Sequence, residues 1–451
     1  MPNPLDVIDD QSNTRPVLTA DEIDAAAKRI SDIIEPTPLQ FSPRLSELSG
    51  ARVYLKREDL TAVRSYKLRG AYNLIVQLTP QERAAGVVAA SAGNHAQGVA
   101  FACRAMGITG RIYVPTTTPK QKRDRIRVHG GEFVELIAIG ETYDAAAAAA
   151  ADDVARTGAT MVPPFDDPRT AAGQGTIAAE VLEQLGAAPD LVVVPVGGGG
   201  CLAGVGTYLR ERTPRTAILA AEPGGAASMT AALVAGGPVT LPEIDPFVDG
   251  AAVRRIGALP YAAAASFGGR ARSHASLPLL ISTESPSGAG SFRVMQVDEG
   301  AICTAMLELY QNEGIIAEPA GALAVAALAE VEVEPGSTVV CLVSGGNNDV
   351  SRYGEIIERS LVHRGLKHYF LVDFPQEPGA LRRFLDEVLG PDDDITLFEY
   401  VKRNNRETGA ALVGIELGAP EGLAALLERI HDSPIQCERL EPGSPAYRYL
   451  T

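Results

Sequence analysis

Several residue types are scarce in this sequence, and each scarcity narrows the range of functions. The 451 residues include no tryptophan and five cysteines, and aromatic residues make up 5% of the chain. The cysteines are widely spaced and odd in number, and no two stand in a C-x-x-C motif. This pattern argues against a disulfide framework and against a zinc site, and it favours reduced thiols in the cytoplasm.

Basic residues and long apolar runs are also in short supply. The chain has 40 Lys and Arg against 56 Asp and Glu, a formal net charge of −16, so neither nucleic acid nor an anionic membrane surface is an expected partner. No run of about eighteen strongly apolar residues exists, so we expect no membrane-spanning helix. The alanine run 145–151 lies between two aspartates and predicts a helix. The acidic N-terminus is not typical of a signal peptide.

Apolar strands alternate with helix-length segments over most of the chain. Strand-like runs at 87–90, 111–115, 191–196 and 338–343 are rich in apolar residues. Such spacing predicts an α/β fold whose parallel sheets are covered by helices on both faces and bind ligands at the carboxyl ends of strands. Residues 264–293 break the pattern, and we expect a long surface excursion there.

The pattern changes near residue 364. Between 368 and 430 the expected order is strand, helix, strand, strand and helix, which is the beginning of a ferredoxin-like module. We therefore expect a flexible tail over 1–18, a catalytic domain over 19–363 and a second domain over 364–451.

One lysine and three turns of small residues carry the chemical signal. Lys67 stands at the start of a helical segment, within Ser-Tyr-Lys-Leu-Arg-Gly-Ala at 65–71. The segments 91–95, 197–200 and 344–348 each end an apolar run in residues that expose the backbone. A lone lysine at a helix start is usually solvated. Together with the three turns of small residues, Lys67 predicts a cleft that holds a phosphate and a carboxylate around a Schiff base, which is a pyridoxal phosphate site.

Four consecutive glycines follow a buried strand and precede a helix: Gly197, Gly198, Gly199 and Gly200. Because they have no Cβ atoms, their backbone N–H groups can converge on an anion, and the helix dipole adds a favourable potential. A tight turn without a ligand is the alternative. The run lacks the G-x-G-x-x-G pattern of a dinucleotide site.

The segment Ser91-Ala92-Gly93-Asn94-His95 has the same place between strand and helix. The amides of Ser91, Ala92 and Gly93, with the Ser91 hydroxyl, are expected to hold a substrate carboxylate. Asn94 is expected to donate to a ring oxygen of the cofactor. His95 completes this substrate-binding segment, without a role as acid or base.

Ser344 ends a third buried strand. A serine hydroxyl can meet a pyridine nitrogen, whereas an aspartate would keep that nitrogen protonated. A neutral partner makes the ring a weaker electron sink, which favours elimination or β-replacement over transamination. A serine that serves only the turn is the alternative.

Together, the segments 65–71, 90–98, 197–200 and 344–347 resemble fold-type II pyridoxal phosphate enzymes, and most closely the threonine ammonia-lyases (biosynthetic threonine dehydratases). The resemblance implies a two-lobed, tryptophan synthase β-like catalytic domain with parallel sheets. It also implies deamination of L-threonine to 2-oxobutanoate and ammonia by α,β-elimination, the first step of isoleucine biosynthesis.

The same resemblance implies a role for each segment. Lys67 carries the cofactor and acts as general base, and Asn94 contacts the ring oxygen. The glycines at 197–200 cradle the phosphate, and Ser344 meets the ring nitrogen. Glu318 belongs to the family pattern too, where it either faces the cofactor or caps a helix.

Two further segments bear on regulation and on metal binding. Residues 374–381 are similar to the ACT-like regulatory domain of these enzymes, which implies feedback inhibition by isoleucine and a homotetramer. Residues 222–226 resemble a loop that binds a cation in some relatives. Ser228 stands where a divalent ion would need an acidic ligand, so no metal is expected.

Two other functions stay open. One is another fold-type II β-eliminating enzyme, such as an L-serine dehydratase or a serine racemase, although the regulatory domain argues against a purely catabolic enzyme. The other is a non-catalytic amino-acid sensor. Lys67 and the four glycines argue against the sensor, because a protein that only senses needs neither.

Overall fold

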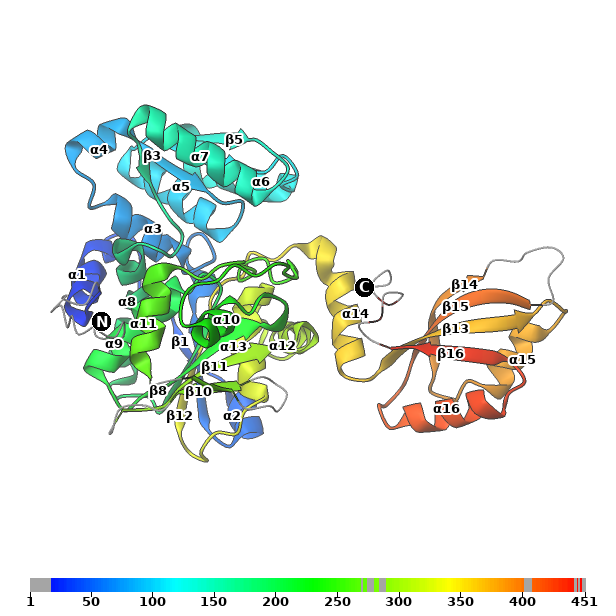
Figure 1. The fold of residues 1–451 in the computed structure, drawn as a ribbon. Coiled ribbons are helices and arrows are strands. Elements are labelled where there is room, and N and C mark those ends of the chain that lie inside the picture. Colours follow the sequence, from blue (N-terminus) through cyan, green and yellow to red (C-terminus); the bar gives the residue numbers. More distant parts are fainter. Residues whose placement is uncertain are drawn as a thin grey trace, which may run out of the picture.

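The computed structural model describes residues 18–268, 271–273, 280–283, 289–400, 408–441, 444 and 447. The tail expected over 1–18 lies outside these residues except for Leu18. Figure 1 shows two lobes, each built on its own sheet, and a C-terminal module joined to them through α14 (Tyr353–His363). The predicted fold class is confirmed.

The large lobe contains an eight-stranded sheet. The strands in spatial order are β1 (Leu39–Phe41), β2 (Arg52–Arg57), β12 (Thr338–Val343), β7 (Leu191–Pro195), β8 (Ala217–Pro223), β11 (Phe292–Val297), β10 (Leu280–Thr283) and β9 (Ala271–Ser273). The strands from β2 to β11 pair in parallel, and β1, β10 and β9 pair antiparallel with their neighbours.

Successive residues of the central strands face two separate apolar cores. In β12, Val339 and Cys341 belong to one core, whereas Val340 and Leu342 belong to the other. Because both faces are buried, the strand has to be apolar throughout, as the sequence suggested.

The small lobe has a four-stranded parallel sheet in the order β5 (Val134–Ala138), β4 (Gly110–Val114), β3 (Val87–Ala90) and β6 (Thr160–Met161). Its helices are α4 (Pro80–Ala85), α5 (Asn94–Met106), α6 (Lys120–Gly130) and α7 (Tyr143–Thr157). The alanine run forms α7, and the Thr142 side chain caps it by accepting from the Ala145 amide.

The helices of the large lobe are α1 (Ala20–Ile30), α2 (Pro43–Ser49), α3 (Lys67–Ile75), α8 (Pro168–Leu185), α9 (Gly200–Arg212), α10 (Ser228–Ala235), α11 (Ala258–Phe267), α12 (Glu299–Glu313) and α13 (Pro319–Ala329). Glycines let α8 touch the backbones of both α3 and α9. A Cβ at Gly173 would lie 2.4 Å from the Arg69 carbonyl oxygen, and one at Gly204 would lie 2.2 Å from the Ala171 carbonyl oxygen. The helix that begins with Lys67 and the helix that begins with Gly200 are thus held on one central helix.

The expectation of a surface excursion over 264–293 is wrong for the described part of that stretch. β9 and β10 extend the large sheet, and β11 begins at Phe292 inside it. The sequence pattern failed because these strands are short and two of them join the sheet edge in antiparallel fashion, outside the parallel alternation. Residues 274–279, which precede β10, lie outside the described residues.

The C-terminal module has an antiparallel sheet in the order β14 (Asp394–Tyr400), β15 (Thr408–Glu416), β13 (Lys367–Pro375) and β16 (Gln436–Leu440). Helices α15 (Ala380–Glu387) and α16 (Gly422–Asp432) connect the strands and share an apolar core with the sheet through Phe384 and Leu426. β16, which the sequence analysis did not assign, completes the ferredoxin-like order. Residues 401–407, between β14 and β15, lie outside the described residues.

None of the helices in the described ranges combines the length and the apolar character that a membrane crossing requires.

Candidate active site

Backbone pairing places Lys67 beside Ser344. The Tyr66 amide donates to the Ser344 carbonyl oxygen at 3.2 Å, and Ser65 forms an antiparallel bridge with Gly345. The Thr61 hydroxyl donates to the Ser65 carbonyl oxygen and accepts from the Ser65 amide, each at 2.9 Å. The loop before α3 is therefore fixed at both ends, and the lysine starts its helix next to the end of β12.

The Lys67 amine has few partners of its own. Its Nζ donates to the Pro164 carbonyl oxygen at 3.2 Å and lies 5.1 Å from the centre of the Tyr66 ring. No other hydrogen bond of this amine is found among the described residues. The side chain is half-buried, and this burial lowers the pKa of Lys67 to about 8 because the charged ammonium loses hydration.

The four glycines form a turn that no larger residue fits. Gly199 has φ of 87°, in the left-handed region. A Cβ at Gly198 would lie 2.0 Å from the Phe165 ring, and a Cβ at Gly197 would lie 2.7 Å from Ala251. The turn links β7 to the N-terminus of α9, where free backbone N–H groups and the helix dipole favour an anion.

One segment, 163–165, connects the lysine to the glycine turn. Pro164 accepts from Lys67, and the Gln174 amide on α8 donates to the same carbonyl oxygen at 3.1 Å. Phe165 packs on Gly198 and Gly200. Sequence analysis missed these residues, because no local motif marks them and α8 alone brings them to the site.

Asn94 and Glu318 form a hydrogen-bonded pair next to the Ser344 turn. Asn94 Nδ2 donates to Glu318 Oε1 at 2.6 Å, and Asn94 Oδ1 accepts from Asn347 Nδ2 at 2.8 Å. A Cβ at Gly345 would lie 2.2 Å from Glu318 Oε1. Burial, followed by the charge of Asp249, raises the pKa of Glu318 to about 7.

Of the two interpretations of Glu318, the helix cap is wrong. Glu318 occupies the N-cap position of α13, but its side chain makes no capping hydrogen bond and is bound to Asn94 instead. The same pair fixes the orientation of the Asn94 amide and leaves one of its N–H groups for a further acceptor.

The segment 91–95 begins α5 on the small lobe. The Gly93 amide donates to the Ser91 hydroxyl at 3.3 Å, Ala92 is half-buried, and space is open next to the Gly93 Cα. The expected substrate carboxylate at this turn stays a prediction. His95 Nε2 contacts the Val162 carbonyl oxygen at 2.7 Å. Burial, aided by the charge of Lys67, lowers the pKa of His95 to about 3, so the ring is neutral.

Ser344 is buried, and its hydroxyl donates to the Ala320 carbonyl oxygen at 3.0 Å. The oxygen keeps lone pairs with which to accept from a protonated ring nitrogen. To donate to a neutral ring nitrogen, the hydroxyl proton would have to turn away from Ala320.

The loop that resembles a cation site is closed by its own backbone. The Glu222 carboxylate accepts from the Met229 and Thr230 amides, each at 2.9 Å, and from the Thr230 hydroxyl. The Ser228 hydroxyl is buried and has no partner within the described residues. Those residues also contain no group of three or more His, Cys, Asp or Glu side chains suited to a metal.

Comparison with known families decides which group this geometry serves. Residues 30–345 match the family described as pyridoxal-phosphate dependent enzyme. The chain belongs to this family. The cofactor predicted from the sequence is thereby confirmed as pyridoxal phosphate. Residues 358–450 of this pyridoxal-phosphate-dependent enzyme match the C-terminal regulatory domain of threonine dehydratase.

The relatives agree with both matches. The enzyme is 69% identical over 433 residues to the L-threonine dehydratase biosynthetic IlvA of Mycobacterium tuberculosis, which covers 96% of each chain. The processed form of threonine deaminase isoform 2 from Solanum lycopersicum superposes with a TM-score of 0.65 and 35% identity, covering 77% of this chain and 96% of that one. Maize serine racemase superposes with a TM-score of 0.66 and 29% identity, covering 77% and 99%. The predicted threonine dehydratase family is confirmed.

The residues present fit pyridoxal phosphate. An amine with a lowered pKa suits a reaction with an aldehyde, and a turn with room for hydrogen atoms alone suits a close phosphate. The structure brings Lys67, Asn94, the glycine turn and Ser344 to one site, although they come from four distant parts of the chain.

Proposed function

We propose that this enzyme deaminates L-threonine to 2-oxobutanoate and ammonia by α,β-elimination, as the first step of isoleucine biosynthesis. The observation that supports this proposal most directly concerns the Lys67 amine. Burial lowers the pKa of this amine to about 8. The chain that contains this amine is 69% identical to a biosynthetic threonine dehydratase. Lys67 is the residue that we expect to carry the cofactor.

Lys67 acts as the general base. When bound, the cofactor supplies an aldehyde for the substrate amine and a conjugated ring that accepts electron density. A lysine whose pKa is about 8 is half neutral near pH 8, so its Nζ can take the α-proton of the bound amino acid. The Pro164 carbonyl oxygen accepts from this Nζ and orients it.

The remaining residues bind and orient. The amides of 197–200 receive the phosphate at the N-terminus of α9, and the fixed amide of Asn94 donates to the ring oxygen. Ser344 meets the ring nitrogen as a neutral partner once its hydroxyl proton turns from Ala320 to that nitrogen, and this arrangement favours loss of a β-substituent. The Ser91, Ala92 and Gly93 turn receives the substrate carboxylate, and neutral His95 adds no charge there.

The test is turnover of threonine with identification of the product. Lys67→Ala should lose at least about 10³-fold in kcat together with the visible absorption band of the bound cofactor, because one residue is both anchor and base. Lys120→Ala is the matched control, since that lysine is 84% exposed on α6. A Lys67→Ala enzyme that keeps its turnover, or a wild type that makes no 2-oxobutanoate, would refute the proposal.

The similarity to maize serine racemase supports a second candidate, an activity on serine. Parallel assays with L-serine, measuring pyruvate and D-serine, separate the two. We expect a higher kcat/KM for threonine. A higher value for serine would favour the second candidate.

We further propose that residues 19–363 are the catalytic domain and residues 364–451 the regulatory domain, which binds isoleucine as feedback inhibitor in a homotetramer. The match of 358–450 to a threonine dehydratase regulatory domain supports this division, as does the end of α14 at His363. The five cysteines are free thiols, which supports the cytoplasm as location. Inhibition assays and sedimentation test effector and assembly.

A further inference from the structure

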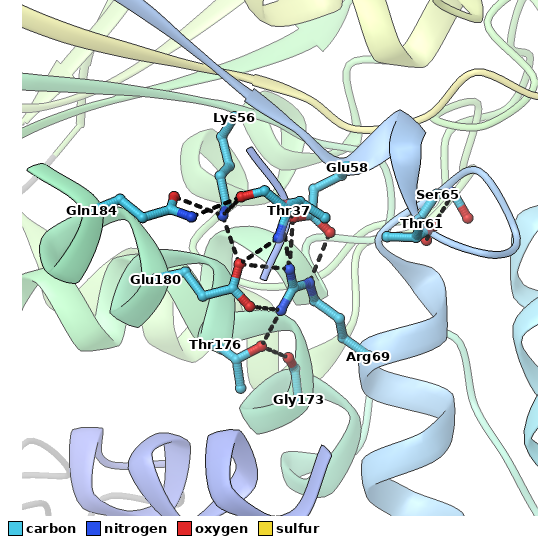
Figure 2. Close-up of polar contacts among 10 residues, drawn as sticks. All are labelled: Thr37, Lys56, Glu58, Thr61, Ser65, Arg69, Gly173, Thr176, Glu180 and Gln184. Atoms are coloured by element: carbon cyan, nitrogen blue, oxygen red, sulfur yellow. Dashed lines mark hydrogen bonds and ion pairs between the residues drawn. The ribbon is translucent and has the colours of Figure 1, made fainter. Parts of the chain in front are cut away.

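A buried group of four charged residues lies on the side of α3 away from the Lys67 amine. Figure 2 shows this ionic cluster, which we define as Lys56, Glu58, Arg69 and Glu180. The side chains of Lys56, Glu58 and Arg69 are 0% exposed, and that of Glu180 is 13% exposed. With two cations and two anions, the cluster is neutral as a whole.

Arg69 is the centre of the cluster. Its Nε and Nη2 donate to the two oxygens of Glu58 at 2.7 and 2.9 Å, and its Nη1 and Nη2 donate to the two oxygens of Glu180 at 2.5 and 2.9 Å. Burial disfavours the charged guanidinium, yet the two carboxylates hold the pKa of Arg69 above its ordinary value. The planar guanidinium is the group that can grip two carboxylates in this two-pronged way.

Lys56, on strand β2, is the second cation of the cluster and binds Glu180. Its Nζ donates to Glu180 Oε2 at 2.6 Å, to the Thr37 carbonyl oxygen at 2.7 Å and to Gln184 Oε1 at 3.1 Å. All three ammonium donors therefore have partners, as a buried lysine requires. Although burial opposes ionisation of Glu180, Arg69 and Lys56 hold the pKa of its carboxyl below the ordinary value.

The cluster ties together the elements that place Lys67. Lys56 belongs to β2, Glu58 begins the short helix η1 (Glu58–Leu60), Arg69 belongs to α3 and Glu180 to α8. Successive helical residues are turned by about 100°, so Arg69 projects from nearly the opposite face of α3 to Lys67. The arginine is thus an anchor for the helix and makes no contact with the amine.

The position of the Lys67 amine depends on Arg69, because the one hydrogen bond that the amine makes among the described residues joins α3 to a segment held by α8. Pro164, the acceptor, is bonded by Gln174 of α8, and the neighbouring Pro163 carbonyl oxygen accepts from the Thr170 hydroxyl of α8 at 3.1 Å. A shift of α3 along α8 would therefore change the distance between Lys67 and Pro164 directly.

We propose that Arg69 is a positioning residue for the reaction: by gripping Glu58 and Glu180 it fixes α3 on η1 and α8, and so sets the Lys67 amine against Pro164 and the glycine turn. This inference rests on the role of Lys67 in the proposed function. Arg69 acts through α3 and has no contact with substrate or cofactor.

Arg69→Lys is the discriminating variant, because it keeps the charge but cannot grip two carboxylates at once. A displacement of about 1 Å at a reacting group costs about 100-fold, so kcat should fall by about that factor while KM changes by less than about threefold. In the enzyme freed of cofactor, the pH midpoint for labelling of Lys67 by a small acylating reagent, read by mass spectrometry, should move from about 8 towards 10.5.

Arg44→Lys is the matched control. Arg44 also bridges two carboxylates, those of Glu308 and Glu313 on α12 at 3.0 and 3.1 Å, and contacts neither α3 nor α8. Its kcat and its Lys67 labelling midpoint should equal those of the wild type. If Arg69→Lys does not fold, Glu180→Gln replaces it, because this variant keeps the shape of the side chain and removes one charge. It should change kcat and the labelling midpoint of Lys67 in the same direction as Arg69→Lys, by a smaller amount.

An unchanged kcat and labelling midpoint in Arg69→Lys would overturn the proposal. So would a loss of activity with an unchanged midpoint and a fall in melting temperature much larger than that of Arg44→Lys, since this result would mean general destabilisation. A shifted midpoint in an enzyme whose wild type does not turn over threonine would support the positioning role and refute the proposed substrate.

Discussion

Glu180, on the side of α3 away from the Lys67 amine, and Glu318, at the proposed active site, are two largely buried carboxyls whose pKa values are shifted in opposite directions. Glu180 is bonded to Arg69 and Lys56, and its pKa lies below the ordinary value. Glu318 is bonded to the neutral amide of Asn94, and its pKa is raised to about 7. Burial pushes both pKa values upward, so the difference comes from the partner.

The comparison distinguishes a carboxylate whose charge has a structural role, Glu180, from a carboxyl whose charge can change near neutral pH, Glu318. Because its pKa lies below the ordinary value, Glu180 is ionised at neutral pH and can hold Arg69 of α3 as an ion pair. Glu318, whose pKa is about 7, changes its charge near neutral pH within hydrogen-bonding distance of Asn94, at the proposed cofactor site. A perturbed carboxyl of that kind is typical of a functional site.

The largest expected effect comes from breaking the charge balance of the ionic cluster. Glu58→Gln keeps the side-chain volume but leaves a buried cation uncompensated, which should lower the free energy of unfolding by about 3–5 kcal/mol. Urea unfolding at neutral pH measures it. Glu308→Gln is the control, because that carboxylate is 47% exposed and its loss should cost at most about 1 kcal/mol. Equal losses in the two variants would contradict the comparison.

Glu318→Gln should remove a pH dependence of stability. The folded-state pKa of about 7 lies above the ordinary value of 4.5, so the folded protein binds more protons between these pH values and loses stability as pH rises. Glutamine does not titrate and still accepts from Asn94. Relative to wild type, the variant should therefore gain about 3 kcal/mol between pH 4.5 and pH 8.

The free energies of unfolding of wild type and Glu318→Gln, measured over this pH range, test the prediction. A difference between them that does not vary with pH would contradict it.

Glu180→Gln is the contrasting variant, because the lowered pKa of Glu180 gives its stability the opposite dependence on pH. Its stabilising contribution is present above the ordinary pKa of a glutamate and is lost as pH falls, so the variant should lose its disadvantage towards acid pH.

The smallest effect is the coupling within one pair. Lys56→Met and Glu180→Gln each leave an unpaired charge, whereas the double variant removes one charge of each sign. Its loss of stability should be smaller than the sum of the single losses by about 1–3 kcal/mol. A double-mutant cycle from urea unfolding gives this number, and additive losses would show that the Lys56–Glu180 pair is energetically unimportant.

Sequence alone could predict the site residues that directly follow strands. The four glycines and the Ser344 turn end β7 and β12, so their meeting at one edge follows from the parallel sheet. The ionic cluster could not be predicted, although Arg69 stands in the Lys67 segment. Its partners Glu58 and Glu180 are 11 and 111 residues away, and only the packing of α3 on α8 brings them together.

The parts of the fold that were missed have a similar cause. The sequence analysis did not assign the start of α8, which begins at Pro168, where Asp167 caps it and the proline occupies the first turn. Gly173 and Gly175 hid this start, since glycine weakens a helical pattern. The glycines are present because α3 and α9 approach too closely for any side chain.

That close approach restricts how the enzyme moves. Gly70 meets Thr170 and Gly175 meets Gly204, each with room for little more than a hydrogen atom, so no deformable layer of side chains separates the three helices. The proposed phosphate site at the start of α9 and the Lys67 amine at the start of α3 are therefore tied to each other through α8. The small lobe meets the same helix closely, because a Cβ at Gly98 of α5 would lie 3.1 Å from the Lys67 carbonyl oxygen, so any displacement of α5 would be transmitted to the start of α3.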